Sequence, residues 1–459
     1  MRSLNKKVFS IIVALIMIVS ITTMPTKATT LMTEGKFDVY SSVYDFGARV
    51  DKVVIRLPNK VSGDSVSADT FVIESANESN ANIEVNNGKR IISDIYVSTS
   101  EDGSKEEVGE FIIINLETKL STQYADVLQW NDPDFTNVPL KIKYNVKQEK
   151  SIKDVDGQEV KYNYTQDKFI QVEVDKFGEG RSESGLNYRD YKPESNGEKH
   201  PLIIWLHGAG EGGDNNVTHI NGNRGAVAFI SDEAQKAFDN PYVLAPQSPD
   251  YWMPELVLGE LVLKGTDNTE KLVDLIKEYI SSNSEIDTSR VYIGGCSMGG
   301  YQTWETLFAA PELFAAAFPI CAAYEVPQEK LDTVKNIPIW VFHAANDDTI
   351  PVKYTQDAYN YLKSNSGNIL YTEYSNVQVD GEDFAPHASW IYPLNNDPVN
   401  ESGEHFYEWL ASQRKDVAVN SNNNSNSNMI VVAGGIIVVL CIGSVFIIRK
   451  KKVKENIKK

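Results

Sequence analysis

Short, uninterrupted apolar runs alternate with amphipathic stretches between residues 186 and 415. Runs of this kind are typical of strands that are buried on both faces of a sheet. They are Leu202–Leu206, Tyr242–Ala245, Val291–Gly294, Ala315–Phe318 and Ile339–Phe342. The intervening stretches place apolar residues at helical spacing, as in Asn268–Ser281, Val352–Lys363 and Glu404–Ser412. This alternation predicts an α/β domain with a mostly parallel sheet and helices on both faces.

Residues 36–175 follow a different pattern, without a convincing long amphipathic helix. Turn-forming pairs such as Pro58-Asn59 and Asp156-Gly157 separate short strand-like stretches. We expect strands at Lys52–Leu57, Thr70–Glu74, Arg90–Ser98, Glu110–Leu116, Leu140–Val146 and Phe169–Val174. Several short strands at this spacing predict an all-β sandwich of immunoglobulin type. The region contains no histidine and no cysteine, so we place no catalytic group in it.

The N-terminus has the three parts of a secretory signal. Arg2, Lys6 and Lys7 precede the apolar run Val8–Ile21, and small and polar residues follow it. We therefore expect a signal peptide over residues 1–28 that is cleaved near Ala28. The alternative is a retained N-terminal anchor, for which the apolar run is short.

The C-terminus contains a candidate membrane span. Residues 429–448 are 20 residues without a charge, which cover about 30 Å as a helix and match the thickness of a bilayer core. The basic tail at residues 449–459 predicts a cytoplasmic end. Residues 420–428 are all Asn and Ser, which is typical of a flexible linker. We expect a single-pass protein of the cell membrane with an extracellular N-terminal ectodomain.

Charge and cysteine content exclude several classes of protein. The formal net charge is −19, and both ends are basic, so the middle of the chain is more acidic than the whole. Such a surface repels nucleic acid, and we expect no nucleic-acid partner. Cys296, Cys321 and Cys441 are too few for a disulfide framework, and no Cys/His spacing suggests a metal site.

The sequence Gly295-Cys296-Ser297-Met298-Gly299 is a G-x-S-x-G motif. A strand-like run leads into it and a helix-like stretch, Tyr301–Phe308, follows it. In this context the serine lies on a strained turn that exposes its hydroxyl, and the flanking glycines avoid collisions. We predict Ser297 as a nucleophile. The alternative is a glycine-rich turn whose serine has no chemical role.

A serine nucleophile needs a histidine base and an acid that orients it. His387 lies in a loop after the strand-like stretch Ile369–Glu373 and is the best base by chain order. His343 ends a predicted strand, and His405 begins the last helix-like stretch. The acid is Asp347 or Asp348, in the loop after the run Ile339–Phe342, and one of the two could instead be a helix N-cap.

Backbone N–H groups must stabilise the oxyanion that forms during acyl transfer. One should belong to Met298, which follows the nucleophile, and the other to Ala209, in the loop after the first predicted strand. Tyr251, Trp252 and Trp390 lie near these loops. They are candidates for substrate binding, with a place in the core as the equal alternative.

Five motifs together resemble a known family: HGAG (207–210), LAPQ (244–247), GGCSMGG (294–300), HAANDDTIP (343–351) and HASW (387–390). They are similar to the α/β-hydrolase esterases of the prolyl-oligopeptidase and polyhydroxybutyrate-depolymerase-like group. The layout resembles bacterial esterases with an N-terminal immunoglobulin-like domain. The resemblance implies that the acid is Asp347 rather than Asp348, and that the base is His387. Cysteine is the nucleophile in some relatives of this fold, but we expect Cys296 to be buried.

The resemblance implies hydrolysis of short acyl esters, in some members of acetyl or feruloyl groups on plant polymers. We expect a serine esterase that forms an acyl-enzyme, acts on small-molecule or polysaccharide-linked esters, and needs no metal or cofactor. Some members act on peptides, so a serine peptidase is the first alternative. A non-catalytic surface binding protein is the second.

Overall fold

The structure, a computed structural model, describes residues 31–81, 83–131, 135–258 and 261–415, which all belong to one compact unit (residues 1–416). The predicted signal peptide (1–28), linker (420–428), membrane span (429–448) and basic tail (449–459) lie outside the described residues. A search of the described part finds no helix with the length and apolar character that crossing a membrane requires.

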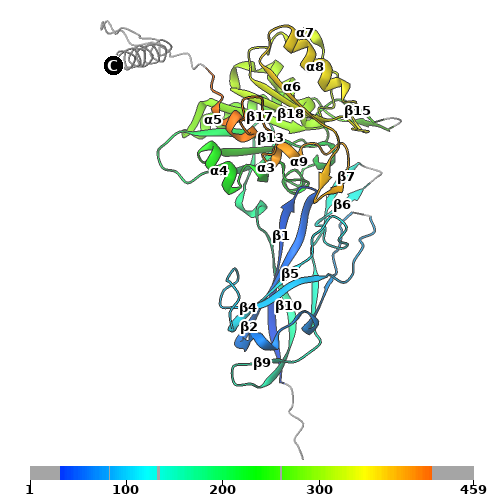
Figure 1. The fold of residues 1–459 in the computed structure, drawn as a ribbon, viewed down its shortest axis with the longest axis vertical. Coiled ribbons are helices and arrows are strands. Elements are labelled where there is room, and N and C mark those ends of the chain that lie inside the picture. The colour runs from blue at the N-terminus through cyan, green and yellow to red at the C-terminus, as the bar shows by residue number, and fades with distance from the viewer. Residues whose placement is uncertain (1–30, 82, 132–134, 259–260, 416–459) are drawn as a thin grey trace, which may run out of the picture. The chain divides into compact units, whose positions relative to one another are not determined.

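The N-terminal part of the described chain is built from strands (Figure 1). Its largest sheet has the order β4-β5-β2-β1-β10-β9. These strands are β1 (Leu31–Tyr44), β2 (Gly47–Ser62), β4 (Ile92–Ser98), β5 (Val108–Leu116), β9 (Ile152–Lys153) and β10 (Glu159–Gln171). Two further pairs join β3 (Phe71–Ser75) to β8 (Tyr144–Gln148) and β6 (Leu128–Asn131) to β7 (Thr136–Pro139). Helical residues here form only the short turns η1 (Gly63–Ser65), η2 (Ala68–Thr70) and η4 (Val174–Lys176), within the described residues. The predicted all-β character is therefore confirmed.

The alternation of side chains along β2 explains why this segment is a strand. Val53 and Ile55 lie in the main core, whereas Val54 packs with Tyr40 and Ile113 in a smaller cluster. Successive side chains of a strand point to opposite faces, so a run of apolar residues can serve two clusters.

Several predicted strands are wrong in their bounds: 52–57 is only the middle of β2, and 169–174 overlaps only the end of β10. The stretch 140–146 becomes a strand only at Tyr144. Ahead of it, the side-chain amide of Gln166 accepts from the Tyr144 N–H and donates to the Ile142 carbonyl, at 2.8 and 3.1 Å. A side chain thus satisfies main-chain groups that a neighbouring strand would otherwise bind.

The C-terminal part is an eight-stranded sheet of order β11-β12-β14-β13-β17-β18-β19-β20. The strands are β11 (Gly178–Arg181), β12 (Asn187–Tyr191), β13 (His200–Leu206), β14 (Tyr242–Gln247), β17 (Ile286–Cys296), β18 (Ala316–Ile320), β19 (Ile339–Ala344) and β20 (Ile369–Tyr374). The six strands from β14 to β20 in this order are parallel to one another. Strand β12 pairs in the antiparallel direction with both β14 and β11. The predicted mostly parallel sheet is confirmed.

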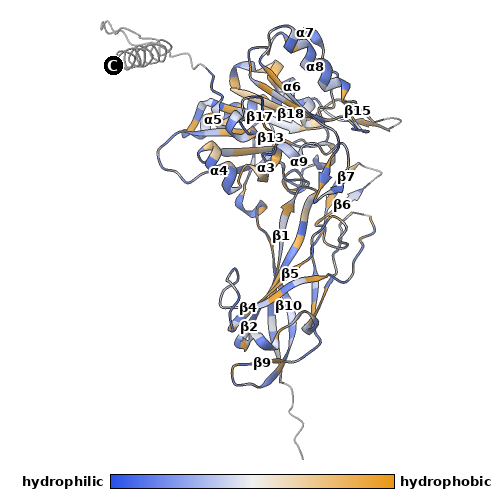
Figure 2. Cartoon of the chain, in the orientation of Figure 1, coloured by the Kyte–Doolittle hydropathy of each residue, from blue (hydrophilic) through white to orange (hydrophobic). Residues whose placement is uncertain are grey.

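Helices cover both faces of this sheet. Along β13, Ile203 and Trp205 belong to one core cluster with residues of α3 (Gly225–Ala228), α4 (Asp232–Phe238) and α10 (Phe406–Ser412). Leu202, Ile204 and Leu206 belong to another, with residues of α5 (Thr269–Ser282), α6 (Met298–Ala309) and α8 (Lys353–Ser364). Figure 2 shows hydrophobic colours on the central strands and hydrophilic colours on the outer sides of α4 and α8. This burial on both faces explains the uninterrupted apolar runs of the sequence.

Shorter elements complete the domain. They are η5 (Ala209–Glu211), α2 (Thr218–Asn221), η6 (Pro311–Leu313), α7 (Gln328–Leu331), α9 (Ile391–Leu394), and the hairpins β15–β16 (Glu255–Leu258, Leu261–Lys264) and β21–β22 (Gln378–Val379, Glu382–Asp383).

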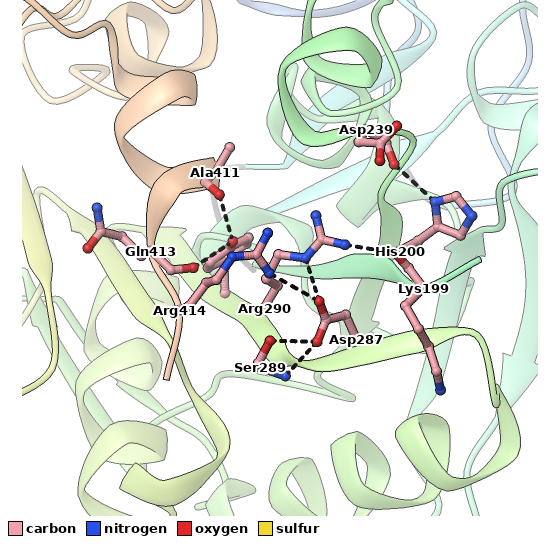
Figure 3. A network of polar contacts seen from close by, with 10 residues as sticks. Lys199, His200, Asp239, Asp287, Ser289, Arg290, Ala411, Gln413 and Arg414 are labelled. Carbon is pink, nitrogen blue, oxygen red and sulfur yellow. Dashed lines mark hydrogen bonds and ion pairs between the residues drawn. The ribbon is translucent and has the colours of Figure 1, made fainter. Parts of the chain in front are cut away.

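A polar network at the amino ends of β13 and β17 ties down the end of the described chain (Figure 3). Asp287 accepts hydrogen bonds from Arg290 Nε at 2.7 Å and Arg414 Nη1 at 3.2 Å, and Arg290 also donates to the Lys199 carbonyl. Burial alone would raise the pKa of Asp287, but bonds from Ser289 and Arg290 outweigh it and lower the pKa to about 2. The carboxylate therefore stays charged and holds the segment after α10 against the sheet.

Candidate active site

The predicted site residues follow the carboxyl ends of β13, β17, β19 and β20. Parallel strands bring their carboxyl ends to one edge of the sheet, where α/β proteins bind ligands. Ser297 directly follows β17, and Ala209 follows β13 after two residues. Asp347 lies in the loop after β19, and His387 lies beyond β20 and the β21–β22 hairpin.

Ser297 occupies a strained turn between β17 and α6. Its backbone has φ 55° and ψ −117°, a conformation that residues with side chains rarely adopt. A Cβ at Gly299 would lie 2.0 Å from the carbonyl oxygen of Leu206, and one at Gly295 would lie 2.4 Å from the same atom. The turn thus needs both glycines to pass close to β13, and the serine is left half-buried at the sheet edge.

Asp347 is the acceptor for two histidines. Its Oδ2 lies 2.7 Å from His387 Nδ1 and 3.0 Å from His343 Nε2. Its Oδ1 accepts from the N–H groups of Thr349 and Ile350, both at 2.9 Å. Burial alone would raise the pKa of Asp347, but the bonds from His343 and His387 outweigh it and hold the pKa well below its ordinary range. The buried side chain is therefore a carboxylate at neutral pH.

The partners of each histidine determine where its proton lies. His343 Nε2 contacts two acceptors, Asp347 Oδ2 and the Ile350 carbonyl, and therefore carries the proton. His343 Nδ1 accepts a hydrogen bond from Thr355 Oγ1 at 2.8 Å. His387 Nδ1 faces the same carboxylate and must also carry a proton. This leaves His387 Nε2 as the basic nitrogen, and it has no hydrogen-bond partner among the described residues.

The environment of His387 favours its charged form. Burial lowers the pKa of His387, but Cys321 and Asp347 together outweigh burial and place the pKa above its ordinary value. Ligand atoms of Cys321, Asp347 and His387 all lie within 4.8 Å of one another. Cys321 is fully buried, and it is also a neighbour of His387.

Ser297 and His387 line one cavity of about 180 Å³. Three of its lining residues come from the β6–β7 hairpin of the N-terminal part: Trp130, Phe135 and Asn137. The other lining residues are Gly208, Ala209, Gly210, Glu211, Asn223, Cys296, Thr349 and Trp390. We predicted no catalytic group in residues 36–175, and this part of the chain instead contributes to the wall of the cavity. Short strands with an exposed tryptophan carried no sequence signal for this role.

The two predicted N–H donors each begin a helical segment. Ala209 is the first residue of η5, and Met298 is the first residue of α6. N–H groups in the first turn of a helix have no acceptor within that helix, so they are available to a ligand. His207 braces this loop: its Nδ1 lies 2.7 Å from the Gly208 carbonyl, and its Nε2 accepts from the Ser248 N–H at 3.0 Å. Burial lowers the pKa of His207 to about 4, so its ring is neutral.

Of the remaining candidate residues, some line the cavity and others lie in the hydrophobic core. Trp390 lines the cavity, and its ring meets that of His387 edge to face at 5.6 Å. Trp252 is fully buried instead, with its ring 5.1 Å from His207. Tyr251 packs against the same core and is not among the cavity residues. Cys296 is buried, which raises the pKa of its thiol well above the ordinary value and makes it a poor nucleophile.

Comparisons with known proteins match both parts of the chain. A family described as the esterase Ig-like N-terminal domain matches residues 37–161, and the phospholipase/carboxylesterase family matches residues 193–381. A solved structure of a thermostable esterase is 30% identical, with a TM-score of 0.71 over 83% of this chain and 99% of that chain. An acylaminoacyl peptidase from Pyrococcus horikoshii is 16% identical, with a TM-score of 0.34 over 48% of this chain and 41% of that chain. The acyl-protein thioesterase 2 of Zea mays is 18% identical, with a TM-score of 0.30 over 42% of this chain and 93% of that chain. No curated protein matches the chain.

Proposed function

Since this chain belongs to the α/β-hydrolase esterases that carry an immunoglobulin-like N-terminal domain, we propose that it cleaves carboxylic esters with a triad of Ser297, His387 and Asp347. The observation that carries this proposal is the state of His387. Its Nδ1 is bound to a buried carboxylate, and its free Nε2 belongs to a residue that shares a cavity with the strained Ser297. A base oriented in this way is what a serine hydroxyl needs to become nucleophilic.

The reaction proceeds by two acyl transfers. Ser297 Oγ bonds to the ester carbonyl carbon while His387 Nε2 takes its proton, and the N–H groups of Ala209 and Met298 stabilise the oxyanion. The C–O bond to the alcohol then breaks, and His387 returns the proton to the leaving alcohol. A water molecule, deprotonated by His387, attacks the acyl-enzyme and releases the carboxylic acid. Asp347 holds the imidazole in the required tautomer throughout.

The cavity supports short acyl groups as substrates. Its volume of about 180 Å³ is below the range of about 300–1,000 Å³ that is usual for drug-sized ligands. Trp130, Phe135 and Trp390 form apolar walls. We propose that the alcohol side lies outside this cavity, so that an acyl group carried by a polysaccharide is accepted as well.

A substrate panel tests this assignment. We expect kcat/KM to be highest for acetyl and butyryl esters and at least about tenfold lower for octanoyl esters, since a chain that exceeds its pocket loses binding at the reacting centre. Purified protein should be assayed on these esters, on methyl ferulate, and on aminoacyl and prolyl amides.

Two outcomes would contradict the proposal. Faster cleavage of the amides than of the esters would favour the peptidase alternative, and a lack of labelling by a fluorophosphonate would favour the non-catalytic one.

In Trp130→Ala the substrate preference should move towards longer acyl chains, because one apolar wall of the cavity is removed.

We also propose that the protein acts outside the cell and is anchored in its membrane. The supporting features are the signal-like residues 1–28, the uncharged run 429–448 and the basic tail 449–459. In cell fractionation the full-length chain should remain with the membranes, and a chain that ends at residue 418 should be released into the medium. Release of the full-length chain would rule out the anchor.

A further inference from the structure

Glu211 is a buried carboxyl group at the active-site cavity. It is the last residue of η5, the turn that begins at Ala209, and it is only 9% exposed. Its main-chain carbonyl accepts from Thr218 Oγ1 at 2.9 Å and from Gln247 Nε2 at 3.0 Å. The backbone is therefore fixed, and the side chain lines the same cavity as Ser297. The triad does not use this group.

The carboxyl group of Glu211 packs closely against the loop that carries Ala209, the proposed oxyanion donor. A Cβ at Gly208 would lie 3.1 Å from Glu211 Oε2 and 3.7 Å from Cys296 Sγ, and one at Gly222 would lie 2.9 Å from Oε1. Asn223 Nδ2 donates to Oε1 at the long distance of 3.4 Å. Oε2 is buried and forms no hydrogen bond of normal geometry within the described part of the chain, although the Gly208 N–H lies near enough to favour the charged form. An ionised carboxylate is thus poorly compensated here.

Apart from His387, which lines the same cavity and whose pKa is raised, the described groups named below as neighbours of Glu211 supply no positive charge. Cys296, at the end of β17, has a thiol pKa raised by burial and is neutral. Burial lowers the pKa values of His207 and His219, so these nearby rings are neutral too. The loop before α3 contributes only the amide of Asn223. Burial raises the pKa of Glu211 to about 7, although the Gly208 N–H and Asn223 lower it. The carboxyl therefore ionises close to neutral pH.

We propose that Glu211 is a positioning residue of the oxyanion loop that supports ester hydrolysis only in its protonated, neutral form. The inference rests on the proposed function, because it concerns charge that develops during acyl transfer. The ester oxygen becomes negative beside the Ala209 N–H, two residues from Glu211, so a carboxylate there repels the developing charge. We expect this repulsion to slow the reaction by about 30-fold.

The pH profile of kcat/KM separates this role from a purely structural one. Activity rises as His387 loses its proton, and the loss of the Glu211 proton near neutral pH opposes that rise, so the wild-type profile should become flat above about pH 7. In Glu211→Gln the carboxyl cannot ionise, and only the rise from His387 should remain. The substrate should be a simple alkyl acetate followed by titration of the released acid, because its alcohol does not ionise in this range. Glu312→Gln, an exposed position outside the cavity, is the matched control and should keep the flattened wild-type profile.

A second variant keeps the inference testable if Glu211→Gln does not fold. Asn223→Ala removes the donor that stabilises the carboxylate, which raises the pKa of Glu211, so the pH at which the profile becomes flat should move to a higher value. A wild-type pH profile that is unchanged in both variants would overturn the inference. A wild type that neither hydrolyses esters nor reacts with a fluorophosphonate at any pH would instead refute the proposed function.

Discussion

Replacement of Ser297 by alanine should abolish ester hydrolysis, with kcat reduced by at least about 10⁴-fold. The variant keeps the turn and the cavity but has no oxygen that can form the acyl-enzyme. Removal of a serine nucleophile leaves only the rate enhancement that comes from binding and the oxyanion donors. Hydrolysis of p-nitrophenyl acetate and labelling by a fluorophosphonate measure the effect, and circular dichroism checks that the variant is folded.

The neighbouring cysteine provides the control for this experiment. Cys296 is the adjacent residue, lines the same cavity, and has a thiol that burial keeps protonated. Cys296→Ala should therefore retain turnover and labelling. If the cysteine variant were inactive and the serine variant active, the assignment of the nucleophile would be wrong.

Replacement of Asp347 by asparagine should lower kcat by about 10⁴-fold while substrate binding changes little. The carboxylate accepts N–H groups at both oxygens: two histidines at Oδ2 and two backbone groups at Oδ1. An asparagine has one acceptor oxygen, so its NH₂ group must face either the histidines or the backbone donors. If it faces the histidines, His387 is held in the wrong tautomer, with its proton on Nε2.

The same substitution should also lower stability. Two N–H groups that now have a buried acceptor would lose it, at a cost of about 1–3 kcal/mol each. Urea unfolding measures this loss, and steady-state kinetics measures the loss of kcat. Asp348→Asn is the matched control, because the adjacent carboxylate is exposed and contacts only Thr349 among the hydrogen bonds of the described residues. An equal loss of kcat in both variants would show that the effect does not come from the bond between Asp347 and His387.

The fold of the C-terminal domain could be predicted because its determinants are local. The run 202–206 is apolar at every position, and the structure buries alternate residues of β13 in two clusters on opposite faces. The turn at Ser297 was visible for the same reason: it needs glycines at fixed offsets from the serine, and these follow from contacts with β13. The predicted bounds of strands were less accurate where a side chain, rather than a neighbouring strand, binds the main-chain groups. Gln166 does this before β8.

The choice between the two aspartates could not be made from residue spacing alone. Both lie in the loop after β19 and both could orient a histidine. The resemblance favoured Asp347, and in the structure it is Asp347 whose carboxylate meets His387. His343, which had been weighed as a base, is instead a second donor to that carboxylate.

The sequence by itself determined which residues we propose to react, since the proposed nucleophile, the proposed base and the glycine-rich loop lie in short motifs whose backbone geometry depends on neighbours along the chain. Tertiary structure alone decided what surrounds them. The β6–β7 hairpin lines the cavity, Trp252 is in the core rather than in the cavity, and one carboxyl oxygen of Glu211 forms no hydrogen bond of normal geometry within the described residues. These features depend on contacts between segments separated by tens to hundreds of residues. No local periodicity records such contacts, because burial and charge balance are properties of the packed molecule.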